Sequence, residues 1–232
     1  MTFNHSGDLG DVIYSLPAIR ALGGGHLYLD STGGLADPLV KWADRKSTKL
    51  NERSIEFIAP LINRLAYVKL TADSSSIDLN LNEFRRHHKY HNLADAHLAI
   101  EGLPFSERDR AWIEPLKPKR LARYVINRTP RYQSNFGWWE DLIPRIQDCC
   151  VFIGYKKEHE YFEYAFRKEG QIPFYQVEGI EDMVNVIAGS ECFMGNEGFC
   201  NALAQSIRHN LICEVNQVYP AVIFKRSNAR YV

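Results

Sequence analysis

Short apolar runs alternate with amphipathic segments along most of this 232-residue chain, and that rhythm restricts the fold more than any other feature of the sequence. Residues 26–30 (HLYLD) alternate apolar and polar side chains, and residues 149–155 (CCVFIGY) form an apolar run, as expected of strands. Residues 12–22 instead place apolar side chains at helical spacing. Strands that alternate repeatedly with helices are typical of βαβ units on a parallel sheet. We therefore predict an α/β fold with two Rossmann-like lobes that face a central cleft.

The boundary between the lobes is expected in residues 114–123 (EPLKPKRLAR). This stretch has two prolines, four basic residues and little apolar periodicity, which is typical of a linker. The length of the chain fits one large or two compact domains, at about 150 residues per domain. We therefore predict an N-terminal lobe over residues 1–118 and a C-terminal lobe over residues 119–232.

The pattern also predicts where the individual elements lie. Pro17 is expected to kink or divide the first helix, and the glycines at 23–25 to end it. In the first lobe we expect strands at 2–5, 26–30, 65–70 and 77–81, and helices at 12–22, 52–64 and in the later part of 85–103. In the second lobe we expect strands at 124–127, 149–155, 174–177, 192–194 and 211–215, and helices at 138–147, 157–168, 180–188 and 198–207.

Composition and charge exclude several classes of protein. Basic and acidic residues both number 28, so the formal net charge is zero and no overall field draws the chain to nucleic acid or to an anionic membrane. No apolar segment approaches the ~18 residues that span a bilayer, and the N-terminus lacks a leader pattern. The five cysteines are odd in number and contain no CxxC pair, which argues against a disulfide framework or a zinc ribbon. We expect a cytoplasmic protein without membrane insertion.

The first candidate site is the loop that opens residues 7–22 (GDLGDVIYSLPAIRAL). Its glycines, Gly7 and Gly10, allow backbone to approach a ligand closely, and the helix that follows offers unpaired amides. Asp8 and Asp11 either cap this helix or face a substrate hydroxyl as a general base. The loop matches neither GxGxxG nor GxxxxGK[ST], so it is neither a dinucleotide fingerprint nor a P-loop.

The second candidate site is a Gly-Asn-Glu-Gly turn between a short strand and a helix. The turn consists of Gly195, Asn196, Glu197 and Gly198. Backbone amides at such a helix start can hold a diphosphate without a lysine. The alternative is an ordinary tight turn of an α/β protein.

The predicted donor site also includes Gly154, Glu158, Arg128 and Arg131. Glu158 follows the apolar strand and Gly154, a position from which a carboxylate can accept hydrogen bonds from both ribose hydroxyls; the alternative is a solvated residue in the first turn of a helix. Arg128, and after it Arg131, can stabilise a leaving diphosphate, or each is an ordinary surface arginine. No Asp-x-Asp triplet is present to hold a divalent metal, so the implied chemistry needs none.

The densest basic run covers residues 85–91 and begins with Arg85. It is either a contact for a phosphate-rich acceptor or a solvated face. His87 and His91 have the i, i+4 spacing of a metal pair, but no nearby cysteine or carboxylate completes a site. We expect no metal and no cofactor.

The first motif resembles that of the heptosyltransferase-like glycosyltransferases, a family of GT-B architecture. The Leu-Gly-Asp triplet at 9–11 and Pro-Ala-Ile-Arg at 17–20 carry the resemblance, and the turn at 195–198 resembles the family's pyrophosphate signature. The resemblance implies that Asp11 is the catalytic base, with the acceptor beside it. The predicted acceptor side of the cleft comprises Ser6, Gly7, Asp8, Gly10 and Arg85.

The sequence departs from the family one turn into the helix after the second motif. The family usually has a histidine there, whereas this chain has Ala202, with Asn201 beside it as the remaining candidate for the donor. The chain is also short for this architecture, and a homodimer is one way to supply the rest of the cleft.

The resemblance implies an inverting, metal-independent transferase that moves a sugar from a nucleotide-diphosphate donor to an acceptor hydroxyl. The acceptor is a glycan such as lipopolysaccharide core, or DNA with hydroxymethylated pyrimidines. Two alternatives stay open: a noncatalytic module that binds a nucleotide or glycan, and a nucleotide-sugar epimerase or hydrolase on the same fold.

Overall fold

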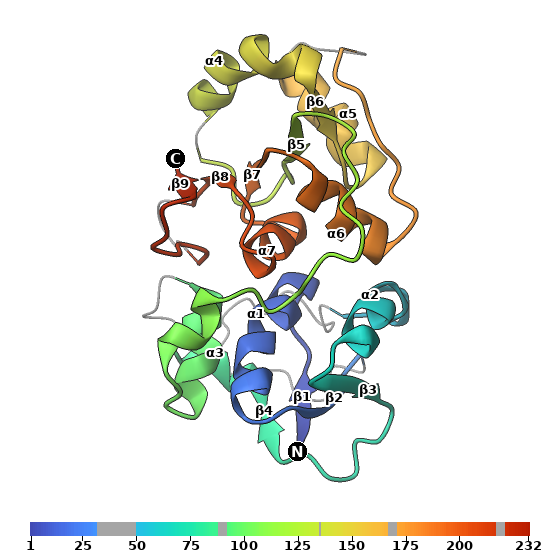
Figure 1. Ribbon diagram of the computed structural model, residues 1–232, viewed down its shortest axis with the longest axis vertical. Helices are drawn as coiled ribbons and strands as arrows, with labels where there is room; N and C mark the ends of the chain where they lie inside the picture. The colour runs from blue at the N-terminus through green and yellow to red at the C-terminus, as the bar shows by residue number, and fades with distance from the viewer. Residues whose placement is uncertain (32–49, 88–91, 135, 167–170, 217–220) are drawn as a thin grey trace. The chain divides into compact units, whose positions relative to one another are not determined.

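The computed structural model describes residues 1–31, 50–87, 92–134, 136–166, 171–216 and 221–232. The chain forms two compact units, Met1–Trp112 and Ile113–Val232 (Figure 1). The expected linker is joined to the second unit, since the backbone N–H of Lys117 donates to Asn185 Oδ1 at 2.9 Å and that of Lys119 to the Asn185 carbonyl at 2.8 Å. The predicted cleft between the lobes stays a prediction.

Unit 1 contains a parallel sheet with the strand order β3-β2-β1-β4. Phe3 of the inner strand β1 is paired with Leu27 on one side and Leu79 on the other, and its side chain is buried. The elements are β1 (Thr2–His5), α1 (Leu9–Ala21), β2 (Gly25–Leu29), α2 (Glu52–Arg64), β3 (Val68–Thr71), β4 (Leu79–Asn80), α3 (Leu93–Ile100) and the 3₁₀ segments η1 (Leu81–His87) and η2 (Phe105–Asp109). The strands and helices predicted for this lobe are confirmed to within a few residues.

Pro17 was expected to kink or divide the first helix; it does not divide it, because α1 continues through it from Leu9 to Ala21. Proline cannot donate the usual hydrogen bond to the carbonyl four residues earlier, which is that of Ile13. The indole N–H of Trp112 donates to this carbonyl instead, at 3.1 Å in the interior of the unit. The Trp112 side chain, distant in sequence, therefore donates to the Ile13 carbonyl, which has no helical donor because of Pro17.

The glycines at 23–25 end α1 as predicted. Gly24 has a φ of +80°, and its amide donates back to the Ile19 carbonyl at 2.9 Å. A Cβ at Gly24 would lie 2.1 Å from the Tyr67 carbonyl oxygen, so the turn needs glycine for its conformation and for the close approach to the segment before β3.

Unit 2 contains a parallel sheet with the strand order β6-β5-β7-β8-β9. Of the strand predicted at 174–177, the structure has only a bridge between Phe152 and Phe174, and the sequence analysis missed β9. The elements are β5 (Tyr124–Asn127), α4 (Phe136–Ile146), β6 (Cys150–Phe152), α5 (Lys156–Phe166), α6 (Ile180–Gly189), β7 (Cys192–Asn196), α7 (Phe199–Ser206), β8 (Leu211–Glu214) and β9 (Ala229–Tyr231).

The core of unit 2 is rich in aromatic side chains. Trp139 from α4 packs edge-on against Phe162 from α5, with the ring centroids 5.4 Å apart, and both are buried beside Phe152 of β6. The helices on this sheet are thus held by apolar packing, as expected of an α/β protein.

All five cysteines are free thiols, and Cys150, Cys200 and Cys213 are buried.

Each sheet has one point where the chain reverses its progress across the strands. In unit 1 the chain moves from β1 outward to β2 and β3, then returns to β4 on the other side of β1. In unit 2 it moves from β5 to β6, then returns to β7 on the other side of β5. Ligands of open parallel sheets bind at the carboxyl ends of the strands beside such a reversal. In this fold a ligand is therefore expected at the ends of β1 and β4 and at the ends of β5 and β7.

Within the described segments, no helix is both long enough and apolar enough to cross a bilayer.

Candidate functional site

The loop after β1 places the Asp11 carboxylate at the start of α1. Asp8 is the N-cap residue and Asp11 the third residue of the helix, and Asp11 Oδ2 accepts a hydrogen bond from the Asp8 amide at 3.0 Å. Asp11 therefore does cap the helix. Capping does not exclude a role as base, because a carboxylate has two oxygens and about four acceptor positions. The Asp11 side chain also retains 13% of its exposure to solvent.

Gly7 is required by the position of that carboxylate. A Cβ at Gly7 would lie 2.5 Å from Asp11 Oδ2 and 2.6 Å from the His5 ring. Gly10 is the second residue of α1, between the two aspartates. Gly7 thus allows the Asp11 carboxylate and the His5 ring to approach the backbone closely.

Arg85 comes from the other side of the reversal point, in η1, and lies beside Asp11. Its guanidinium is 3.9 Å from Asp11 Oδ2 and stacks 4.6 Å above the Phe84 ring, and its side chain is 17% exposed. The sequence left open whether Arg85 belongs to a solvated basic face. The structure instead places it, with little exposure, beside the candidate base. Residues 88–91 of the basic run lie outside the described residues.

Asn82 joins the two loops of this site and was missed in the sequence analysis. Its Oδ1 accepts hydrogen bonds from the Ser6 amide and the Ser6 hydroxyl, each at 3.0 Å, and from Arg85 Nη1 at 3.1 Å. Its amide group donates to Asn80 Oδ1 at 2.9 Å. The signal was the pair of asparagines, Asn80 and Asn82, in the alternating run 78–82, which begins in β4 and continues into η1. Ser6 and Arg85, both predicted for the acceptor side beside Asp11, are thus joined through Asn82.

The predicted donor turn of unit 2 follows β7 and is joined to the loop after β5. Asn196 is 1% exposed, and its Oδ1 accepts from the Thr129 amide at 2.9 Å while its Nδ2 donates to the Thr129 carbonyl at 3.0 Å. A Cβ at Gly195 would lie 2.3 Å from the Asn127 carbonyl oxygen, so the strands approach each other too closely for any other residue. The turn therefore lies at the reversal point, as a ligand site of this fold should.

Gly198 is the N-cap of α7 and leaves the first turn without a capping side chain. Its φ of −118° and ψ of −176° are extended, so no left-handed conformation requires glycine here. A Cβ would still meet Thr129 Cγ2 at 3.0 Å, which is tight. The value of glycine at this position is space near the amides of the helix start, where an anion is favoured.

Glu158 lies where the sequence placed it, in the first turn of α5 beyond the end of β6. Its Oε2 accepts from the Tyr155 amide at 3.1 Å and from Asn127 Nδ2 at 3.3 Å. Burial raises the pKa of the Glu158 carboxyl, and those two donors oppose the rise. Gly154 has a φ of +117°, and a Cβ there would lie 2.4 Å from Asn127 Nδ2. Gly154 thus leaves room for the contact between Asn127 and Glu158.

Arg128 is not available to a diphosphate in this structure, which corrects the first choice made from the sequence. Its side chain is 1% exposed, and its Nε and Nη2 donate to the two oxygens of Glu214 at 2.7 and 3.0 Å. Glu214, at the end of β8, also accepts from the Trp139 indole at 2.8 Å. Arg131 is exposed and donates to the Tyr132 hydroxyl at 2.6 Å, so it is the arginine of this loop that solvent reaches.

Glu197 and Asn201 also face the interior, in contrast to the prediction that they contact the donor. Glu197 is 8% exposed and accepts hydrogen bonds from the amides of Asn216 at 2.5 Å and Ala221 at 3.2 Å. Burial raises the pKa of its carboxyl to about 7. Asn201 and Ala202 are fully buried in α7. The side chains of Glu197 and Asn201 are therefore directed into unit 2.

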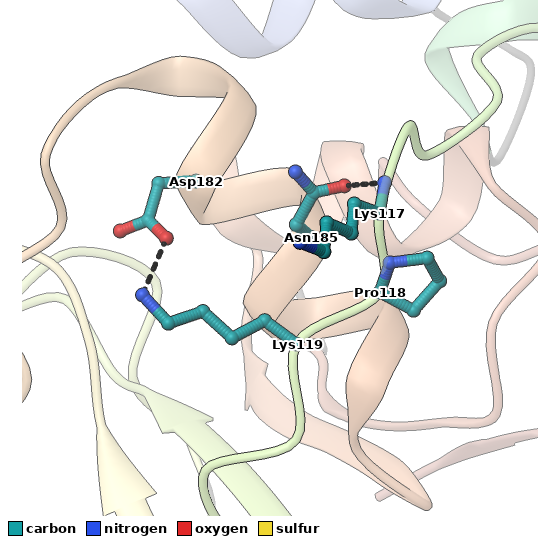
Figure 2. Close-up of a pocket in the computed structure, with 5 residues that line it drawn as sticks. All are labelled: Lys117, Pro118, Lys119, Asp182 and Asn185. Carbon is teal, nitrogen blue, oxygen red and sulfur yellow. Dashed lines mark hydrogen bonds and ion pairs between the residues drawn. The ribbon is translucent and has the colours of Figure 1, made fainter.

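A hollow of about 390 Å³ lies elsewhere on unit 2, between the segment 117–119 and α6 (Figure 2). Lys119 Nζ is 3.1 Å from Asp182 Oδ1 and also donates to the Tyr175 hydroxyl. The other lining residues are Lys117, Pro118 and Asn185. None of these residues lies at the carboxyl ends of β5 or β7, so the hollow is separate from the candidate donor site.

The metal pair considered for the basic run includes His91, which lies outside the described residues. Within the ranges that the structure describes, no group of three or more histidine, cysteine, aspartate or glutamate side chains is arranged to hold a metal ion.

Comparisons with known proteins agree with the predicted architecture. No protein-family model and no curated protein sequence matches the chain. Among solved structures, Escherichia coli heptosyltransferase WaaC with ADP is similar, with a TM-score of 0.58 and 9% identity over 99% of this chain and 92% of WaaC. The iron-containing dodecameric glycosyltransferase TibC of enterotoxigenic E. coli gives 0.59 and 13%, over 98% of this chain and 61% of TibC.

A glycosyl transferase of family 9 from Veillonella parvula is similar as well, with a TM-score of 0.58 and 11% identity over all of this chain and 84% of that protein. At such low sequence identity, the structural similarity shows the fold alone. The chain therefore has the fold of the heptosyltransferase-like glycosyltransferases, as the two sequence motifs predicted.

Proposed function

We propose that this chain is an inverting glycosyltransferase that needs no metal and uses a nucleotide-diphosphate sugar, with Asp11 as the general base. The observation that carries the proposal is the site at the ends of β1 and β4. There a carboxylate on a helix N-terminus lies 3.9 Å from an arginine and keeps partial access to solvent. A base must be reachable by the hydroxyl that it deprotonates, and the exposure of Asp11 meets this requirement.

The reaction would begin with the acceptor hydroxyl hydrogen-bonded to the Asp11 carboxylate. As the hydroxyl oxygen attacks the anomeric carbon, its proton passes to Asp11, and the bond from that carbon to the diphosphate breaks with its electron pair on the diphosphate. Attack from the side opposite the leaving group inverts the anomeric centre. Arg85 would hold the carboxylate in place, and Ser6 and Asn82 would hold the loop around it.

The donor would lie on unit 2, at the ends of β5, β6 and β7. The uncapped first turn of α7 would supply amides to the diphosphate, in place of a metal ion. Glu158 would accept from the ribose hydroxyls. Because Arg128 is held by Glu214, Arg131 is the arginine proposed to approach the leaving diphosphate. The solved structure of WaaC contains ADP, which makes an adenine nucleotide the first donor class to test.

A glycan such as lipopolysaccharide core, or DNA with hydroxymethylated pyrimidines, is the proposed acceptor. Arg85 supports an acceptor with anionic groups, since its guanidinium lies beside the base and is not fully buried. A noncatalytic binding module is the second candidate, and the observation in its favour is Ala202, buried where the family usually carries a histidine.

The proposal is tested by thermal denaturation with ADP, UDP, GDP and CDP and their sugars, followed by a transfer assay with the donor that binds. A ligand at about 100 times its Kd adds about 2.7 kcal/mol to the free energy of unfolding, which is readily measured. Glu158→Ala should reduce the stabilisation, whereas Asp11→Asn should retain it. Binding of a donor without transfer to any acceptor would favour the binding module, and binding of none would contradict both.

A further inference from the structure

Two buried histidines lie directly beneath the loop that carries Asp11. His5 is the last residue of β1 and His97 lies in α3, and both side chains are fully buried. Their Nε2 atoms are 3.1 Å apart. The Phe84 ring stacks on both imidazoles, with centroid distances of 5.8 Å to His5 and 4.2 Å to His97. Phe84 is also the ring under the Arg85 guanidinium, so the pair belongs to the same packed group as the candidate site.

The hydrogen bonds of the pair determine where each proton is. The Gly7 amide can only donate, and it points at His5 Nδ1 at 2.9 Å, so His5 Nδ1 accepts. His5 is therefore neutral with its proton on Nε2, which donates to His97 Nε2. At the other end, the Leu93 carbonyl can only accept, and His97 Nδ1 lies 2.7 Å from it. His97 Nδ1 therefore carries the proton and its Nε2 accepts. The two ends lead independently to the same assignment.

This series of hydrogen bonds ends at Gly7, which lies directly against the Asp11 carboxylate. A Cβ at Gly7 would meet both Asp11 Oδ2 and the His5 ring within 2.6 Å, so the glycine is enclosed between the two side chains. If His5 changed tautomer, its Nδ1–H would face the Gly7 N–H. Two donors would then oppose each other in the interior, and the loop would have to move.

We propose that His97 is a positioning residue for Asp11: it holds His5 in the Nε2–H tautomer, and His5 in turn holds the Gly7 amide beneath the carboxylate. The importance of this position for catalysis rests on the proposed function. The environment of His97 supports a constantly neutral ring. Burial, opposed by the hydrogen bond to the Leu93 carbonyl and assisted by the Arg85 guanidinium, lowers the pKa of His97 to about 3.

The test compares His97→Phe with His97→Gln. Phenylalanine can stack on Phe84 but offers no acceptor to His5 Nε2–H, whereas the glutamine side-chain oxygen can accept that bond. The tautomers of His5 and His97 are assigned from the nitrogen chemical shifts of ¹⁵N-labelled protein, and the Gly7 amide is followed in the same samples. His209→Phe is the matched control, since His209 is a partly buried histidine of unit 2 whose Nε2 lies 3.0 Å from Ser190 Oγ.

In the wild type we expect His5 with its proton on Nε2 and His97 with its proton on Nδ1. In His97→Phe we expect loss of the single His5 tautomer, a shifted Gly7 amide, and a kcat reduced roughly 10- to 100-fold with an unchanged KM for the donor, as expected when a reacting group is misplaced by about 1 Å. His97→Gln should restore the tautomer and most of kcat. His209→Phe should change neither.

A wild-type His5 with its proton on Nδ1 would overturn the proposal, whether or not His97→Phe folds. So would an unchanged His5 tautomer and Gly7 amide in His97→Phe, or a His97→Gln variant that behaves like His97→Phe. If the wild type transfers no sugar to any acceptor, the proposed function fails, and the tautomer and amide readings still decide whether His97 positions the loop.

Discussion

The two units have the same kind of sheet but use their charged side chains in opposite ways. In unit 1 the charged pair at the reversal point is Asp11 and Arg85, 3.9 Å apart and 13% and 17% exposed. In unit 2 the pair next to the reversal point is Arg128 and Glu214, 2.7 Å apart and 1% and 0% exposed. The first pair is loose and accessible to solvent, whereas the second is tight and buried.

This difference separates charges that can act on a ligand from charges that maintain the fold. A carboxylate that takes a proton from a substrate must be reached by it, and its geometry must tolerate the change of charge. A buried pair has already lost its hydration, and each partner depends on the other. Under the proposed function, unit 1 would present a side chain to its substrate, whereas unit 2 would present mainly backbone amides and Glu158.

The largest expected effect is that of Asp11→Asn on transfer. Asparagine retains an oxygen that can accept from the Asp8 amide, so the helix cap is kept, but it cannot take up the proton of the acceptor. We expect a loss of 10²- to 10⁴-fold in the rate of transfer, which is roughly 3 to 5 kcal/mol in the barrier. Single-turnover kinetics with saturating donor measures it.

The matched control is Asp8→Asn, which changes a neighbouring carboxylate of the same loop in the same way. It should leave most of the rate intact. If Asp11→Asn turned over as fast as Asp8→Asn, the contrast between an acting pair in unit 1 and a structural pair in unit 2 would be broken.

The second expected effect concerns stability and tests the buried pair. Arg128→Ala leaves the Glu214 carboxylate buried without its ionic partner, which should cost about 3 to 5 kcal/mol in the free energy of unfolding of unit 2. Arg131→Ala removes an exposed arginine three residues along and should cost within about 0.5 kcal/mol. Urea denaturation followed by tryptophan fluorescence compares the two. If the two variants were equally stable, the buried pair of Arg128 and Glu214 would contribute no more to the stability of unit 2 than the exposed Arg131 does.

The smallest expected effect is a pH dependence of stability that has opposite signs for two groups, His97 of unit 1 and Glu197 of unit 2. Burial lowers the pKa of His97 from 6.5 to about 3, so its contribution to stability is complete above pH 6.5 and is lost as the pH falls toward 3. Burial raises the pKa of Glu197 from 4.5 to about 7, so its contribution is complete below pH 4.5 and is lost as the pH rises through 7.

Glu197→Gln isolates the second term, since His209 in the same unit has a pKa lowered to about 4 and acts in the opposite direction. Relative to this variant, the wild type should lose on the order of 1 kcal/mol per pH unit between pH 4.5 and 7. The measurement is the free energy of unfolding at pH 5, 6 and 7 for both proteins. A constant difference across that range would show that Glu197 does not titrate there.

Much of the fold followed from local patterns. The first helix was expected because Asp8 and Asp11 precede an apolar periodicity and glycines follow it, and these are signals between neighbouring residues. The strand predicted at 174–177 shrank to a bridge and β9 was missed, because a short edge strand depends on its partner more than on its own residues. The continuity of α1 through Pro17 depended on Trp112, almost a hundred residues away.

The candidate site divides in the same way. The sequence by itself determined that Asp11 starts a helix beside a glycine loop, that Glu158 follows a strand, and that the chain alternates strands and helices, because each of these depends on spacing along the chain. Only the tertiary structure decided that Arg85 lies beside Asp11, that Arg128 is buried against Glu214, and that His5 meets His97. Those relations join residues that are 74, 86 and 92 positions apart. Burial and pairing at such separations depend on the order of strands in the sheet, which no local pattern specifies.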